Sequence, residues 1–167
     1  AGFLPLFLAA PPPLPEGEMQ LTVLDVGHGL AVVARTRHHA LLFDTGTAFG
    51  PQADSGNRVI VPYLRAAGVA ALDVMIVSHD DLDHYGGASS VLQAMPVAQL
   101  LTSIPASDPL LFEAASAGKC IAGQAWEWDG VHFDMLHPTR ASYDDASIKD
   151  NNRGCVLRIA AGKHVAL

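Results

Sequence analysis

The chain has 167 residues, of which half are hydrophobic and 16% are charged, so it can bury one sizeable core but is too short for two ordinary domains. The formal net charge is −7, with only ten Lys and Arg residues. This balance argues against unaided binding of duplex nucleic acid, because such binding normally uses Lys and Arg to displace counterions. A DNA-binding role would need bound cations or another part of the parent protein to supply the attraction.

The first 18 residues form a segment of their own. Residues 3–10 are apolar but well short of the roughly 20 residues that span a bilayer, and no basic stretch precedes them as in a signal peptide. Prolines at positions 11–13 and 15 predict a stiff, extended spacer. Two interpretations fit residues 1–18: the end of a longer transmembrane segment followed by a Pro-rich tether, or a disordered apolar terminus.

The rest of the chain shows the periodicities of an α/β domain. Apolar and β-branched residues predict strands over 19–25, 30–36, 39–43, 74–77, 97–103, 125–128, 131–136, 155–160 and 163–167. Helical spacing and capping residues predict helices over 59–67, 88–95 and 109–117. Polar stretches with Gly or Pro predict loops over 47–56 and 143–154. Antiparallel strands followed by alternating helices and strands indicate a sheet flanked by helices.

The most informative segment is residues 78–86, Ser-His-Asp-Asp-Leu-Asp-His-Tyr-Gly. It follows a buried strand and precedes a helix, so its ionisable side chains share one strand-to-helix turn. Two imidazoles and two carboxylates packed that closely repel, or compete for water, unless a cation holds them together. The segment therefore predicts a metal site, most simply one for two ions, and a solvated acidic turn is the alternative. The ligands it offers are His79, Asp81, Asp83 and His84.

The pattern His-x-Asp-x-Asp-His-x-Gly-Gly over residues 79–87 resembles the metal-binding signature of the metallo-β-lactamase superfamily, usually His-x-His-x-Asp-His. Asp81 stands where the second His usually stands. Together with Leu-Asp-Val-Gly-His-Gly at 24–29 and Leu-Phe-Asp-Thr-Gly at 42–46, the pattern resembles the ComEC family of DNA-internalisation competence proteins. Leu30 departs from that family, in which many members carry an acidic residue there.

The resemblance implies an αββα sandwich over residues 19–167, whose C-terminal part, with later metal ligands, is missing from this chain. The fragment is therefore expected to be inactive by itself. One ion would be held by His79 and Asp81. The other would be held by His84 and by Asp83, which is also the expected catalytic residue. Further residues that the resemblance places near the metals or the substrate are Asp25, His28, Asp44, Asn152 and Arg153.

Two ions about 4 Å apart can activate water and stabilise the attacking and leaving oxygens of a phosphodiester. Asp81 in place of a histidine makes its site richer in oxygen, which favours Mn²⁺ or Mg²⁺ over Zn²⁺. We therefore expect two divalent ions as cofactors, with Mn²⁺ favoured and Zn²⁺ as the alternative. Some of the outer residues have simpler interpretations: a turn-forming residue for Asp44, and an ordinary polar loop for Asn152 and Arg153.

By resemblance, the parent protein lies in the cytoplasmic membrane, residues 1–18 end a transmembrane segment, and this domain is on the extracytoplasmic side. The domain would be a nuclease that degrades the non-transported strand of transforming DNA. Its partners would be that DNA, the membrane-embedded remainder of the protein and other competence-pilus or DNA-receptor proteins. Two alternatives stay open: a hydrolase of another phosphoester or a thioester, and a non-catalytic module that binds DNA or gates the channel.

Three features carry weaker expectations. Cys120 and Cys155 are more simply two buried thiols than a disulfide, since no spacing shows that they meet. His137, before Pro138, is interpreted as a surface or hydrogen-bonded histidine and is left out of the ligand set. A truncated sandwich exposes apolar sheet, so the isolated chain is expected to aggregate or dimerise.

Overall fold

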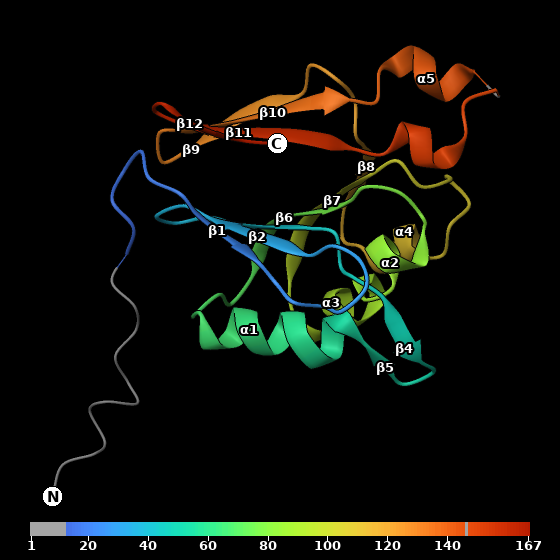
Figure 1. Ribbon diagram of the computed structural model, residues 1–167, viewed down its shortest axis with the longest axis horizontal. Helices are drawn as coiled ribbons and strands as arrows, with labels where there is room; N and C mark the ends of the chain where they lie inside the picture. The colour runs from blue at the N-terminus through green and yellow to red at the C-terminus, as the bar shows by residue number, and fades with distance from the viewer. Residues whose placement is uncertain (1–12, 146) are drawn as a thin grey trace, which may run out of the picture.

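The computed structural model of this protein describes residues 13–145 and 147–167 (Figure 1). The apolar run 3–10, interpreted as the end of a transmembrane segment, lies outside these residues. Within the described ranges no helix is both long and apolar enough to cross a bilayer. Residues 13–19 lead through a turn at Glu16 and Gly17 into the first strand.

The larger sheet combines an antiparallel meander with a parallel half. Its strand order is β1-β2-β3-β6-β7-β8, where β1 is Gln20–Val23, β2 Val32–Arg35, β3 Ala40–Phe43, β6 Leu72–Val77, β7 Val97–Thr102 and β8 Ala117–Lys119. β1, β2 and β3 pair antiparallel, whereas β3, β6, β7 and β8 run parallel. The carboxyl ends of β3 and β6 therefore lie side by side, at the edge where ligands bind in open α/β sheets.

The smaller sheet is an antiparallel meander in the order β12-β11-β10-β9. Its strands are β9 (Ala125–Trp128), β10 (Val131–His137), β11 (Val156–Ala161) and β12 (His164–Ala166). The turn between β9 and β10 consists of Asp129 and Gly130, both with positive φ, 51° and 78°, as a tight two-residue hairpin requires. This sheet packs on one face of the larger sheet (Figure 1).

Short helices cover the opposite face of the larger sheet (Figure 1). They are α1 (Val61–Ala66), which continues a π-helical turn η2 (Gly56–Ile60), α3 (Ala88–Ala94) and α4 (Leu110–Glu113). Smaller elements are the hairpin β4 (Ala48–Gly50) and β5 (Ala53–Asp54), the one-turn helix α2 (Leu82–Tyr85), α5 (Arg140–Asp144) and the 3-10 turn η3 (Asp150–Arg153).

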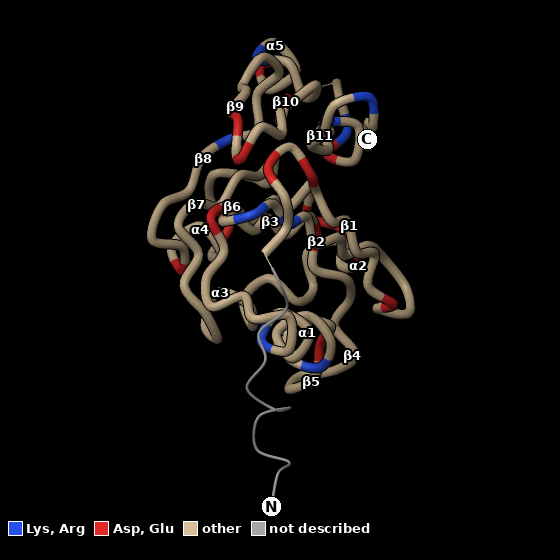
Figure 2. Tube along the Cα trace, turned by 90° about the vertical axis from the view of Figure 1, so that its left-hand side faces the viewer, with Lys and Arg blue, Asp and Glu red and all other residues tan. Residues whose placement is uncertain are grey.

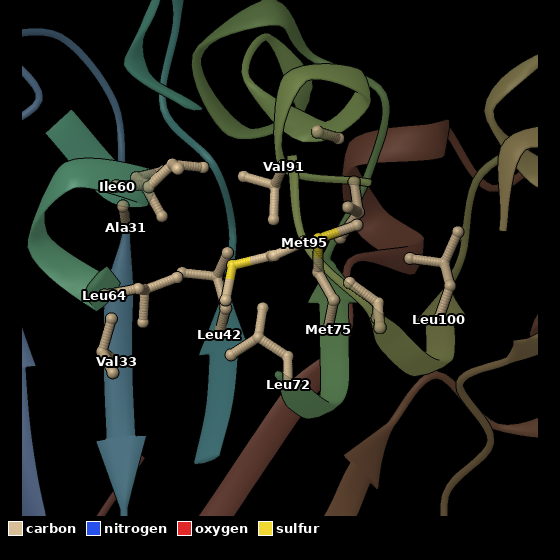
Figure 3. Close-up of a cluster of buried hydrophobic side chains, with 14 of the residues drawn as sticks. Ala31, Val33, Leu42, Ile60, Leu64, Leu72, Met75, Val91, Met95 and Leu100 are labelled. Atoms are coloured by element: carbon tan, nitrogen blue, oxygen red, sulfur yellow. The ribbon is translucent and has the colours of Figure 1, made fainter. Parts of the chain in front are cut away.

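Alternation along the central strands divides the core into two layers. In β3, Leu42 belongs to the cluster on the helix side and Leu41 to the cluster between the sheets, and in β6 Met75 and Ile76 divide in the same way. Figure 3 shows the helix-side cluster, where Leu42 and Met75 lie near Leu64. Each fully buried side chain of this size contributes roughly 1.5–3 kcal/mol. The helix, sheet and sheet layers are those of the expected sandwich, so the fold class is confirmed.

Local expectations failed where tertiary pairing overrides propensity. The helix expected over 109–117 ends at Glu113, because Ala114 is extended and the carbonyl of Ser116 accepts a hydrogen bond from the amide of Leu100. A helix this short is barely stable by itself, so pairing of β8 with β7 prevails. The two expected loops are also more ordered than predicted: 47–56 contains β4 and β5, and 143–154 contains the end of α5 and η3.

The expectation of two free thiols was wrong. Cys120 and Cys155 form a disulfide, with Cα atoms 5.9 Å apart, and both are buried in the cluster between the sheets. Cys120 directly follows β8 of the larger sheet, and Cys155 directly precedes β11 of the smaller one. The bond therefore ties the two sheets together. Its partners are 35 residues apart in sequence, and only the packing of the sheets brings them into contact.

Candidate metal centre

The candidate metal centre forms where the loops after β1, β3 and β6 meet. Helix α2 opens with the amide of His84 donating to the carbonyl of Asp81 at 2.9 Å. The loop after β3 holds this turn, since the amide and Oγ1 of Thr45 donate to the carbonyl of His84 at 2.8 and 2.9 Å. The loop after β1 holds it as well, because the amide of Leu30 donates to the carbonyl of Asp83 at 3.2 Å.

The two histidines of the turn lie beside each other, with ring centroids 4.3 Å apart. Nδ1 of His79 is 2.8 Å from Oγ of Ser78, which itself donates to the carboxylate of Asp44. Because the hydroxyl proton is given to Asp44, Nδ1 of His79 is the donor in its own contact. Nδ1 of His84 likewise donates to Oδ2 of Asp44 at 2.6 Å. In a neutral ring this leaves Nε2 with a free lone pair, the form that a metal-binding histidine needs.

Each of these Nε2 atoms faces a carboxylate oxygen. Nε2 of His79 lies 3.4 Å from Oδ2 of Asp81, and Nε2 of His84 lies 3.6 Å from Oδ2 of Asp83. Two ligand atoms at about 2.1 Å from one tetrahedral ion lie about 3.4 Å apart. The separations and the donor types of both pairs are therefore compatible with one divalent ion between each histidine and its carboxylate.

The donor set in this chain is incomplete. Residues 13–145 and 147–167 contain no group of three or more His, Cys, Asp or Glu side chains placed to hold one ion together. Each His–Asp pair supplies two donors, whereas catalytic zinc sites take three ligands from the protein. The assignment of His79, Asp81, Asp83 and His84 as metal ligands stays a prediction.

Asp44 organises both histidines. Its carboxylate is fully buried and accepts three hydrogen bonds, from the amide and Oγ of Ser78 and from Nδ1 of His84. The hydrogen bond to Asp44 raises the pKa of His84, burial opposes this shift, and the charges of Asp44, Asp83 and Asp81 add to it. The backbone of Asp44 has a positive φ of 57°, which Asp tolerates better than most residues. Both interpretations of Asp44, support of a ligand and a turn residue, thus agree with the structure.

The residues of the loop after β1 differ in their placement. The side chain of His28 is exposed, and its Nε2 lies 3.5 Å from Oδ2 of Asp83. Asp25 instead accepts a hydrogen bond from the amide of Gly27 at 3.1 Å. The structure therefore brings His28 to the candidate centre and gives Asp25 a turn-forming contact.

Asn152 and Arg153, the two residues expected near the substrate, are also placed differently. Asn152 lines a cavity of about 350 Å³ together with His79 and His84. The guanidinium of Arg153 donates to the carbonyls of Ser142 and Asp145 at 2.9 and 2.8 Å, and to Asp150 at 2.7 Å. These bonds engage all three guanidinium nitrogens with α5 and the residues around Arg153, which agrees with the simpler interpretation of a polar loop. The placement of Arg153 near the substrate stays a prediction.

His137, which the sequence pattern favours as a surface or hydrogen-bonded histidine, lies in the same cavity. Its Nδ1 lies 2.9 Å from the carbonyl of Gly154, so this nitrogen is the donor and Nε2 is free. A signal was present in the sequence. The buried residues of β10 are at odd positions, Val131, Phe133 and Met135. His137 has the same parity, but a bulge between Met135 and His137 interrupts the alternation, so this signal was weak.

The comparisons with known proteins show the family. The sequence profile of the Metallo-beta-lactamase superfamily matches residues 24–144. The chain belongs to this superfamily. It is similar to Competence protein ComA of Neisseria gonorrhoeae, with 42% identity over 91% of the chain and 20% of that protein. It is also similar to Recombination protein 2 of Haemophilus influenzae, with 35% identity over 89% of the chain and 18% of that protein. The chain spans about one fifth of the length of these relatives.

Solved structures share the fold. Metallo-beta-lactamase SMB-1 superposes with a TM-score of 0.56 and 16% identity, over 90% of this chain and 58% of that one. CmlA of Streptomyces venezuelae, a diiron beta-hydroxylase, superposes with a TM-score of 0.54 and 17% identity, over 87% and 28%. At these identities the likeness shows the fold and leaves the chemistry to the site residues.

Proposed function

We propose that this chain is part of a metal-dependent phosphodiesterase domain that cleaves DNA in a ComEC-like uptake protein. The observation that carries the proposal is the pair of adjacent imidazoles, each with Nε2 facing a carboxylate at 3.4 or 3.6 Å. The superfamily consists mainly of metal-dependent hydrolases, and the relatives named for competence and for recombination support DNA as substrate.

The residues of the chain would divide the work. His79 and Asp81 would hold one divalent ion, and Asp83 and His84 the other. When bound, two such ions lower the pKa of water and stabilise negative charge on a phosphodiester. Asp44 would orient His84 directly and His79 through Ser78, so that Nε2 of each ring could bind an ion. The exposed amide of Asn152 beside the cavity would donate to a phosphate oxygen.

Charge also favours a metal-dependent encounter with DNA. Figure 2 shows Lys and Arg scattered over several elements rather than gathered in one patch, and the chain carries a net charge of −7. Because DNA repels such a surface, bound cations or the rest of the protein would have to attract it. We therefore expect DNA binding by this domain to depend on added divalent cations.

The proposed location is the extracytoplasmic side of the cytoplasmic membrane, with transforming DNA, the membrane-embedded remainder and other competence-pilus or DNA-receptor proteins as partners. The disulfide between Cys120 and Cys155 supports this side of the membrane, because disulfides persist in oxidising compartments and are rare in the cytosol. The competence relatives support the membrane assignment.

The test uses the full-length protein, since residues 13–145 and 147–167 place only two candidate ligands at each ion. Metal content and cleavage of single- and double-stranded DNA are compared for wild type, His79→Ala and Asp83→Asn. The matched control is His132→Ala, whose exposed ring contacts Glu127 on the smaller sheet. We expect wild type and the control to contain two ions and to cleave DNA. In the two site variants we expect both the metal content and the cleavage to be lost.

Other outcomes would replace the proposal. A metal-loaded protein that hydrolyses thioesters or small phosphoesters but leaves DNA intact would be a different hydrolase. A protein without metal, in which DNA uptake survives both site substitutions, would be a binding or gating module. The incomplete ligand set is the observation that keeps this second candidate.

A further inference from the structure

The disulfide lies directly behind the candidate metal centre. Cys155 contributes to the cavity that contains His79, His84 and His137. Its amide donates to the carbonyl of Ser78 at 3.0 Å, and Ser78 is the residue that precedes His79 and contacts its Nδ1. One hydrogen bond thus connects Cys155 to residues 78–86, the segment with the four candidate ligands, which we call the metal turn.

Gly154, the residue before Cys155, makes a second connection. Its carbonyl accepts the hydrogen bond from Nδ1 of His137. Its backbone also packs on the turn, because a Cβ added to Gly154 would lie 3.7 Å from Nδ1 of His79. The residues directly before β11 therefore lie beside His79, in the turn after β6, and His137, at the end of β10.

The other half of the disulfide is anchored in the larger sheet. The amide of Cys120 donates to the carbonyl of Thr102, the last residue of β7, at 2.9 Å. Oγ1 of Thr102 in turn donates to the carbonyl of Val77, the last residue of β6, at 2.7 Å. The disulfide consequently closes a ring of short contacts around the base of the metal turn: β6, β7, Cys120, Cys155 and Ser78.

We propose that the Cys120–Cys155 disulfide is a positioning element of the metal centre, which holds the start of β11 against the metal turn and keeps His79 and His137 in place. The metal-binding part of this inference rests on the proposed function, and the positional part does not. It follows that the centre binds metal more tightly in an oxidising compartment than in a reducing one.

The experiment compares oxidised full-length protein, the same protein reduced by a phosphine, and the Cys120→Ala/Cys155→Ala variant. Reduction breaks the S–S bond and leaves the two cysteines as thiols. The phosphine takes the oxygen of one water molecule and becomes a phosphine oxide, and the two hydrogens of that water go to the sulfurs. The phosphine is removed under anaerobic conditions before measurement. Amide hydrogen exchange of residues 77–84 and 150–156 is measured without metal, and Mn²⁺ affinity is measured by titration.

The matched control is Asp129→Asn, which weakens a different set of hydrogen bonds between the two sheets, at the end of the sandwich away from the metal turn. There Oδ2 of Asp129 accepts hydrogen bonds from Oγ1 of Thr36 at 2.6 Å and from the amide of His38 at 2.8 Å. Asn tolerates the positive φ of this position. The variant therefore lowers stability without touching the metal turn.

We expect faster exchange in both segments and at least tenfold weaker Mn²⁺ binding in the reduced protein and the double variant, with recovery on reoxidation and neither change in the control. Unchanged exchange in the folded double variant or the reduced protein would overturn the proposal. An equal loss of Mn²⁺ affinity in Asp129→Asn would also overturn it, because the effect would then be one of stability. Wild type that binds no metal would refute the proposed function, while the exchange data would still decide the positional role.

Discussion

Nδ1 of His84 lies 2.6 Å from Oδ2 of Asp44, and the carboxylate of Asp44 is completely buried. The aspartate follows β3 and the histidine belongs to α2, so their hydrogen bond attaches the helical half of the metal turn to the neighbouring parallel strand. Because Asp44 also accepts the amide of Ser78 at the other end of the turn, one carboxylate sets the position of both histidine rings.

Replacing Asp44 by Asn is expected to lower Mn²⁺ affinity by about 10- to 100-fold, the usual cost of losing an outer partner of a metal-binding histidine. The amide of Asn brings a donor toward Nδ1 of His84 or the amide of Ser78, which are donors themselves. Titration of the metal-free protein with Mn²⁺ measures the loss. Asp73→Asn is the control, because Asp73 makes the same kind of contacts, with Nδ1 of His39 and the amide of Ala40, at the opposite end of β3. Equal losses in both variants would contradict the role of Asp44.

The stability of the metal-free protein is expected to fall as pH rises above neutrality. The pKa of His84 is raised above its ordinary value of 6.5, chiefly by the hydrogen bond to Asp44. The stabilisation from protonated His84 is therefore complete below the unfolded pKa and is lost as the pH rises through the folded pKa. Urea unfolding between about pH 5 and 8 measures this loss. A His84→Gln variant should give a flatter profile, and identical slopes in the two proteins would refute the assignment.

Two glycines in the loop after β1 are expected to respond very differently to alanine. Both have positive φ, 78° at Gly27 and 106° at Gly29, but a Cβ at Gly27 meets no atom within 4 Å, whereas one at Gly29 would lie 1.9 Å from the carbonyl oxygen of Asp83. Gly27→Ala should cost about 1–2 kcal/mol for its backbone conformation. Gly29→Ala should add about 1–3 kcal/mol for the forced backbone shift and weaken Mn²⁺ binding. Urea unfolding and Mn²⁺ titration measure both effects. Similar values for the two variants would show that the loop does not press on the metal turn.

Restoring the usual histidine at position 81 is expected to change metal preference. Oδ2 of Asp81 lies 3.4 Å from Nε2 of His79, and a carboxylate there favours Mn²⁺ or Mg²⁺, whereas an imidazole suits Zn²⁺. Asp81→His should therefore raise the ratio of Zn²⁺ to Mn²⁺ affinity relative to wild type, measured by competitive titration of the full-length protein. Asp80→His is the control, since the neighbouring Asp80 has no contact with either histidine among the described hydrogen bonds and ion pairs. An unchanged ratio in Asp81→His would place Asp81 outside the centre.

The amino-acid sequence by itself determined the buried strands of the layers and the turn on which the four candidate ligands lie. Nearly continuous apolar runs in β3 and β6 dictate two buried faces, because successive side chains of a strand point to opposite sides. The segment from Ser78 to Gly86 is local as well, so its ligands share a turn in any fold that forms the preceding strand. These features depend on residues that are close in sequence, and the structure agrees with them.

Only the tertiary structure decided which distant groups meet. The amide of Leu100 binds the carbonyl of Ser116, directly before β8, and α4 ends early. Asp44 accepts hydrogen bonds from Ser78 and His84, and Cys120 pairs with Cys155. His137 enters the cavity because the smaller sheet packs across the larger one. Each of these contacts joins separate elements, and its geometry depends on how the two sheets pack, which local periodicity does not encode.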